Sequence, residues 1–270
     1  MVRRREPLDP EAAQFPPVVP RGPSLARAPR AGGACGACGA RTMSAMLPAA
    51  AAIRAAIVDL DGTMVDTVGD FERALGGALA DLGHAPVSRA FIRRTVGKGT
   101  EHLVRCALAE AGAPAALYEQ ALARYHHHYA GINGAHSEVF AGVVEGLRAM
   151  RAAGWRLACL TNKPTAFARP LLALKGLDGF FEQTFGGDAF ARKKPDPLPL
   201  VETCRALGTA PAATLMLGDS SNDAAAARAA GCPVVLVSYG YNHGEPVAGA
   251  GADAVVDRLD EVLPLLRRRG

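Results

Sequence analysis

Short apolar runs alternate with amphipathic segments along the chain from residue 53 onward. The runs are typical of strands buried on both faces of a parallel sheet, and the segments between them predict helices that end at glycine. This alternation predicts an α/β fold with a mostly parallel sheet. The expected strands cover 54–58, 155–160, 183–185, 214–217, 233–237 and 252–257, and the expected helices cover 141–153, 164–175, 197–207 and 223–230.

The region between the first two expected strands is almost wholly helical and is far too long for a single crossover connection. We expect a helical cap over 66–138, inserted into a Rossmann-like parallel-sheet core that comprises 53–65 and 139–270. The expected cap helices are 70–82, 88–96, 100–111 and 114–129, with glycine and proline turn signals between them.

The first 52 residues are rich in Pro, Ala, Gly and Arg and have neither strand nor helix periodicity, which predicts disorder. They carry seven arginines against three acids, and this excess equals the formal net charge of +4 of the whole chain. The rest of the chain is therefore neutral, which argues against a nucleic-acid partner. A start at Met43 or Met46, with a mis-annotated segment before it, explains this tail better than an organelle transit peptide.

Cysteine use and hydropathy indicate a reduced, cytoplasmic protein without a membrane partner. Cys35 and Cys38 form a lone CxxC in low-complexity sequence, where a zinc or redox site is not expected. No run reaches the roughly 18 uncharged apolar residues of a membrane span. The oligomeric state stays open between monomer and homodimer. The four other cysteines are expected in the core: Cys106, Cys159, Cys204 and Cys232.

Candidate chemistry begins with "DLDGTMVDT", which directly follows the apolar run that ends at Val58. Residues i and i+2 of a strand point to the same side, so Asp59 and Asp61 can face one ligand at the carboxyl end of the sheet. Two carboxylates this close repel each other unless a cation or a proton separates them, as in a nucleophile, general acid and metal site. The alternative for such a pair alone is a turn whose acids face water.

Three further expected strands end in polar residues. Thr161 and Asn162 follow one strand in "TNKP", Lys193 and Lys194 precede a proline-started helix in "RKKPDP", and Asp219 and Asp223 follow another strand in "LGDSSND". In this order and combination, with Asp59 and Asp61 first, these segments resemble the four motifs of the haloacid dehalogenase superfamily of phosphotransferases. The resemblance covers residues 53–270.

The resemblance implies a role for each acid. Asp59 would be the nucleophile that becomes an aspartyl phosphate, and Asp61 would protonate the leaving group and then serve as base for water. Mg²⁺ would be held by Asp59, the backbone carbonyl of Asp61, and Asp219, with Asp223 in support. A helix cap is the alternative role of Asp223.

The resemblance also implies a phosphoryl site. Thr161 and the amide of Asn162 would hold the phosphoryl group, and Lys194 would balance its charge. Lys194 is favoured over Lys193 because the family pattern places the lysine directly before proline. A helix N-cap is the alternative role of Thr161.

Within the superfamily, the chain resembles the bacterial phosphoglycolate phosphatases in "TVGKGTEHLV", "TNKP", "KKPDPLPL", "LGDSSNDAAAARAAGCPVV" and "YGYNHGE". This implies Mg²⁺-dependent hydrolysis of a small phosphorylated metabolite, 2-phosphoglycolate, to glycolate and phosphate. Gly97 and Lys98 of the cap loop would contact the substrate, although Lys98 replaces a commonly neutral residue and could equally be an exposed lysine. The alternatives are a sugar or amino-sugar phosphatase, a β-phosphoglucomutase-like phosphotransferase, and a binding module without catalysis.

Overall fold

The computed structural model describes residues 47–268. Most of the expected tail, including Cys35 and Cys38, therefore lies outside the described residues. Of its described part, Leu47 is buried and packs in the main core cluster. Within 47–268 no helix is both long and apolar enough to cross a bilayer.

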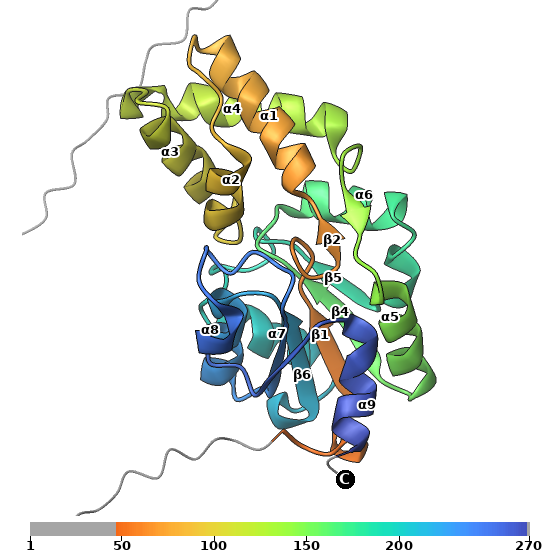
Figure 1. Ribbon diagram of the computed structural model, residues 1–270. Coiled ribbons are helices and arrows are strands. Elements are labelled where there is room, and N and C mark those ends of the chain that lie inside the picture. The colour runs from red at the N-terminus through yellow and green to blue at the C-terminus, as the bar shows by residue number, and fades with distance from the viewer. Residues whose placement is uncertain (1–46, 269–270) are drawn as a thin grey trace, which may run out of the picture. The chain divides into compact units, whose positions relative to one another are not determined.

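A six-stranded parallel sheet forms the centre of the core (Figure 1). Strand β1 lies between β4 and β6, and chain connections leave it in both directions, which creates a switch point at its carboxyl end. The strands, in spatial order, are β5 (Gln183–Phe185), β4 (Arg156–Leu160), β1 (Ala55–Val58), β6 (Thr214–Gly218), β7 (Val234–Val237) and β8 (Ala254–Val256).

Helices cover both faces of this sheet because successive strand side chains point to opposite faces. Ala56 and Val58 belong to the cluster that contains α5 (Val143–Ala152), α6 (Thr165–Leu174) and α9 (Val262–Arg267). Ala55 and Ile57 belong to the cluster on the other face, with α7 (Leu198–Ala206) and α8 (Ser221–Ala230). All four strand residues are fully buried, which explains why their run is continuously apolar.

Four of the five α-helices between β1 and β4 in the sequence bury a hydrophobic cluster of their own. A short antiparallel ribbon, β2 (Val65–Asp66) with β3 (Glu138–Val139), pairs the segments by which the chain enters and leaves this region. The expected boundaries of the cap at 66 and 138 fall in this ribbon, and the division into domains stays a prediction. The helices are α1 (Val68–Asp81), α2 (Arg89–Thr95), α3 (Thr100–Glu110) and α4 (Tyr118–Ile132).

The predicted α/β class with a parallel sheet and helical insertion is confirmed, and the six expected strands are present within one or two residues of their expected bounds. The expected helix at 114–129 differs, because a 3₁₀ turn over Ala115–Leu117 precedes α4. The ribbon β2–β3 and helix α9 were not predicted. Two-residue strands are too short to show alternation, and Pro264 in the first turn of α9 obscures a helix that tolerates it there.

Candidate active site

Three strands end in polar residues at one edge of the sheet. Asp59 follows β1, Thr161 follows β4, and Asp219 follows β6. These strands are parallel neighbours in register, so their carboxyl ends lie side by side. The sheet topology therefore brings together motifs that are separated by up to 160 residues in the sequence.

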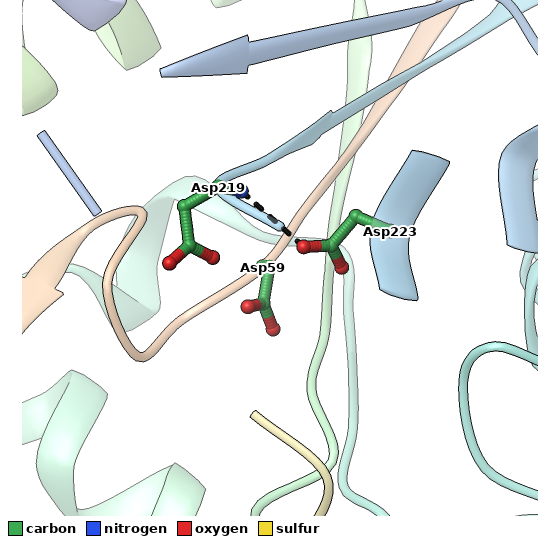
Figure 2. A group of neighbouring side chains, drawn as sticks. All are labelled: Asp59, Asp219 and Asp223. Carbon is green, nitrogen blue, oxygen red and sulfur yellow. Dashed lines mark hydrogen bonds between the residues drawn. The ribbon is translucent and has the colours of Figure 1, made fainter. Parts of the chain in front are cut away.

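Asp59, Asp219 and Asp223 form a cluster of buried carboxylates, each with an oxygen within 4.8 Å of the others. Figure 2 shows them converging from the end of β1, the end of β6 and helix α8. Lys194 Nζ lies 2.9 Å from Asp59 Oδ1 and 2.7 Å from Asp223 Oδ1. We call these three acids the carboxylate cluster. One ammonium cannot neutralise three carboxylates, so the ionised cluster keeps an excess of negative charge.

This excess charge affects proton binding at the cluster. Burial raises the pKa of Asp59 to about 7, against the attraction of Lys194 and with the repulsion of Asp223. Burial and the repulsion of Asp223 and Asp59 raise the pKa of Asp219 well above its usual range. Burial disfavours the charged form of Lys194, but Asp223 and Asp59 outweigh it and raise the pKa of the ammonium. The carboxylates thus favour protons or an added cation.

Backbone N–H groups and hydroxyl groups fix the orientation of Asp219 and Asp223. Asp223 Oδ2 accepts from the backbone N–H groups of Asp219 and Ser220, both at 3.2 Å, at the start of α8. Asp219 Oδ2 accepts from the N–H of Tyr241 at 2.6 Å, and its Oδ1 accepts from Thr63 Oγ1 at 3.2 Å. Thr63 and Tyr241 were not predicted as site residues, although both lie in segments that carried the family resemblance.

Two glycines allow the backbone to approach Asp219. Gly62 has a φ of +86°, and a Cβ there would lie 2.2 Å from Asp219 Oδ2. A Cβ at Gly240 would lie 2.2 Å from the Cβ of Asp219. Only glycine fits at these two positions beside the Asp219 side chain.

The residues of the cluster fit a hard divalent cation. All three acids offer carboxylate oxygens, the ligand type that Mg²⁺ prefers. Oδ1 of Asp59 is buried and, apart from its ion pair with Lys194, has no hydrogen-bond partner within residues 47–268. A divalent cation would offset the charge that Lys194 leaves uncompensated.

Asp61 points its carboxylate to a different partner. Its Oδ1 lies 2.9 Å from Nζ of Lys163, and both side chains are at least nine-tenths buried. Lys163 belongs to the "TNKP" segment but was not predicted to have a role. Its position two residues after Thr161, in the loop at a strand end, was the available signal. The sequence could not indicate which acid it would contact.

Thr161 and Asn162 organise the loop after β4. Thr161 Oγ1 accepts from the backbone N–H of Lys163 at 3.2 Å. Asn162 Nδ2 donates to the carbonyl oxygens of Gly97 and Lys194, both at 2.9 Å, and its Oδ1 accepts from the N–H of Lys194 at 3.0 Å. The side chain of Asn162 thus connects Lys194 to Gly97 in the loop between α2 and α3.

A cavity lies between the sheet edge and helices α1, α3 and α4, and we call it the cap cavity. Gly97 lines it, whereas Lys98 is exposed and is not among its lining residues. A substrate contact by Lys98 therefore stays a prediction. The cap cavity is lined by Asp59, Asp61, Phe71, Val96, Gly97, Gly99, Thr100, Leu103, Tyr125, Tyr129, Thr161, Asn162, Lys163 and Phe167.

Comparisons with known proteins place this site in a family. Residues 53–231 match the model of the haloacid dehalogenase-like hydrolases. The chain is 46% identical over 212 residues to a phosphoglycolate phosphatase of Thiobacillus denitrificans, covering 77% of this chain and 93% of the relative. It is 47% identical over 213 residues to a plasmid-encoded phosphoglycolate phosphatase of Cupriavidus necator, covering 78% and 92%.

A solved structure gives the same result. The crystal structure of a predicted phosphoglycolate phosphatase from Haemophilus somnus superposes with a TM-score of 0.76 at 30% identity. The match covers 79% of this chain and 98% of that one. The fold, the motif order and the length of the match agree, and the chain belongs to the haloacid dehalogenase-like hydrolases.

Proposed function

We propose that the chain is a Mg²⁺-dependent phosphatase that hydrolyses 2-phosphoglycolate to glycolate and phosphate through an aspartyl phosphate on Asp59. The observation that carries the proposal is the carboxylate cluster with Lys194, buried at the sheet edge beside Asp61. The relatives named phosphoglycolate phosphatase, at 46–47% identity, support the choice of substrate.

Asp59, the backbone carbonyl of Asp61, and Asp219 would hold the Mg²⁺, with Asp223 in support. When bound, the cation reduces the repulsion between a phosphate dianion and the carboxylates around it. Lys194 adds a fixed positive charge at Asp59, held there by Asp223 and by the carbonyl of Leu160 at 3.0 Å.

The two aspartates of the first motif divide the reaction between them. A carboxylate oxygen of Asp59 attacks phosphorus, the bond to the glycolate oxygen breaks, and Asp61 gives its proton to that oxygen. Water then attacks phosphorus, Asp61 takes the proton from the water, and the bond between phosphorus and Asp59 breaks. Both side chains line the cap cavity, as these roles require.

The loop after β4 supplies the phosphoryl site in this proposal. Thr161 and the backbone N–H of Asn162 hold the phosphoryl oxygens, in a site made of polar groups that are already buried and positioned. We further propose that 66–138 acts as a cap domain that closes over the cavity and excludes bulk water. The hydrogen bond from Asn162 to Gly97 supports a closed arrangement in this structure.

Phosphate release from a panel of monoesters tests the proposal. The panel holds 2-phosphoglycolate, ethyl phosphate, several hexose phosphates, an amino-sugar 6-phosphate and p-nitrophenyl phosphate, each with Mg²⁺ and with chelator. We expect the highest kcat/KM for 2-phosphoglycolate and no turnover in chelator. A leading sugar phosphate would instead indicate another small-metabolite phosphatase. An isomerised sugar phosphate without free phosphate would indicate a phosphotransferase.

A further inference from the structure

Lys163 is a buried cation whose hydrogen-bonding capacity is largely unused. An ammonium has three donors, and the single hydrogen bond of Lys163 Nζ within 47–268 goes to Asp61 at 2.9 Å. Nζ also lies 4.6 and 4.7 Å from the ring centroids of Phe71 and Tyr129, a distance at which the ring faces stabilise a cation. These contacts hold the ammonium at the wall of the cap cavity and leave donors free for a ligand.

The hydroxyl of Tyr129 is a second unused donor in the same wall. Tyr129 is 1% exposed, and its hydroxyl oxygen has no hydrogen-bond partner among the residues that the structure describes. Burial raises the pKa of this hydroxyl, so it stays protonated and can donate. A buried polar group without a partner is unfavourable, and a ligand that accepts from this hydroxyl would remove that cost.

The remaining walls of the cap cavity determine what kind of group could bind there. Lys163 is the only cationic side chain among the described residues that line it. Gly99 and Thr100 bring the start of α3, with its partial positive charge, to the same cavity. The other walls include Phe71, Leu103 and Phe167, which offer no hydrogen bonds to the hydroxyls of a sugar.

We propose that Lys163 is a specificity-determining residue whose ammonium, assisted by the Tyr129 hydroxyl, binds the carboxylate of the substrate while the phosphoryl group lies at Asp59. This inference rests on the proposed function and names the contact that would distinguish a phosphorylated carboxylic acid from a neutral phosphate ester. A single negative charge matches the single ammonium.

Ethyl phosphate tests this contact because it carries a methyl group where 2-phosphoglycolate carries its carboxylate. Lys163→Met keeps an unbranched side chain and removes the charge. We expect kcat/KM for 2-phosphoglycolate to fall about 100-fold or more, and kcat/KM for ethyl phosphate to fall less than about tenfold. Tyr129→Phe removes only the hydroxyl, and should lower kcat/KM for 2-phosphoglycolate alone, by about tenfold.

The ratio of the two kcat/KM values separates a binding role from a structural one. An equal loss for both substrates in Lys163→Met would mean that Lys163 only positions Asp61, and would overturn the inference. If Lys98→Met loses the preference for 2-phosphoglycolate over ethyl phosphate and Lys163→Met keeps it, the substrate carboxylate binds Lys98. That result would also overturn the inference. A wild-type enzyme without preference for 2-phosphoglycolate would instead contradict the proposed function.

Lys163→Arg keeps the charge and guards against a folding defect in the methionine variant, in which Asp61 is left buried and unpaired. If Lys163→Met does not fold, Lys163→Arg and Tyr129→Phe decide the matter. We expect Lys163→Arg to keep a clear preference for 2-phosphoglycolate and Tyr129→Phe to weaken it. An unchanged preference in Tyr129→Phe together with a lost preference in Lys163→Arg would contradict the contact as described.

Discussion

The carboxylate cluster and the Asp61–Lys163 pair are both buried, and they lie next to each other in the active site, yet their charge differs. The cluster holds three acids against one ammonium, whereas the pair holds one acid against one ammonium. Burial of a cluster with uncompensated negative charge is unfavourable, and a cation bound from solution would reduce that cost. A balanced pair can be buried in the protein alone, and Lys163 keeps donors for a ligand.

This difference indicates how a site can separate two tasks. The cluster is built from the ends of β1 and β6 and the first turn of α8, which hold it rigidly and suit it to the chemistry of the phosphoryl group. The pair faces helices α1 and α4 through the rings of Phe71 and Tyr129, on the side of the cap cavity formed by these helices. We infer that the cluster holds the cation and the nucleophile, whereas the pair supplies the general acid through Asp61 and selects the substrate through Lys163.

The largest expected effect comes from Asp59→Asn, which removes the proposed nucleophile and a cluster charge. We expect kcat to fall by at least about 10⁴-fold, with the near-UV circular dichroism of the wild type retained. Single-turnover assays with 2-phosphoglycolate measure the loss. Residual activity within about 100-fold of wild type would refute the covalent mechanism.

Asp61→Asn sharpens the comparison because it changes the pair and leaves the cluster's side chains intact. We expect kcat to fall about 10²- to 10⁴-fold, the range of general acid–base catalysis. Binding of Mg²⁺ should remain within about threefold of wild type, because only the backbone of Asp61 is assigned to the cation. Calorimetric titration measures the Mg²⁺ affinity. Abolished Mg²⁺ binding would mean that the cation depends on the Asp61 side chain as well as on the carboxylate cluster.

Gly62→Ala tests the close packing around the cluster, with Gly83→Ala as a matched control. Both glycines have positive φ, +86° and +77°, so both variants carry a strain of about 1 kcal/mol. A Cβ at Gly83 meets nothing within 4 Å, whereas one at Gly62 clashes with Asp219. Urea unfolding should give a larger loss for Gly62→Ala than for Gly83→Ala, and only Gly62→Ala should weaken Mg²⁺ binding. Equal losses of unfolding free energy in the two variants would show that the clash with Asp219 contributes nothing.

The smallest effect concerns stability without metal. An acid with a raised folded-state pKa binds more protons folded than unfolded, so it destabilises the fold as pH rises from about 4 through that pKa. For Asp59 this window runs from 3.8 to about 7, and Asp219 shifts in the same direction. In chelator at about pH 8, Asp219→Asn should therefore melt about 2–4 °C above wild type.

Two comparisons check that stability prediction. The advantage of Asp219→Asn should shrink at about pH 5, where the wild-type acids regain protons, and excess Mg²⁺ should reverse the order of stability. Thermal unfolding under the three conditions measures both. A variant that melts below wild type by the same margin at both pH values would show that charge crowding is unimportant in the cluster.

The sequence predicted the cluster well because two of its acids, Asp59 and Asp219, follow short apolar runs. Such runs are buried strands, and their order in a parallel sheet places Asp59 and Asp219 at one edge. The sequence did not predict the partners of these acids. Contacts such as Thr63 with Asp219 depend on how loops cross in space, and no local pattern encodes them.

The cap cavity was less predictable for a related reason. Helical periodicity predicted α1 and α4 but not that Phe71 and Tyr129 would enclose Lys163, since the same spacing is typical of any helix core. Lys98 stood out in the sequence as a departure from the family pattern, yet its side chain is exposed. Lys163 was not predicted because the role of its segment, "TNKP", was already assigned to Thr161 and Asn162.

Titration of Mg²⁺ into wild type, Asp219→Asn and Lys163→Met by calorimetry tests the division of the site most directly. The account predicts one bound Mg²⁺ per wild-type chain, affinity within about threefold of wild type for Lys163→Met, and no binding at millimolar concentration for Asp219→Asn. Wild-type affinity in Asp219→Asn, or lost binding in Lys163→Met, would contradict the separation of a metal-holding half from a substrate-selecting half.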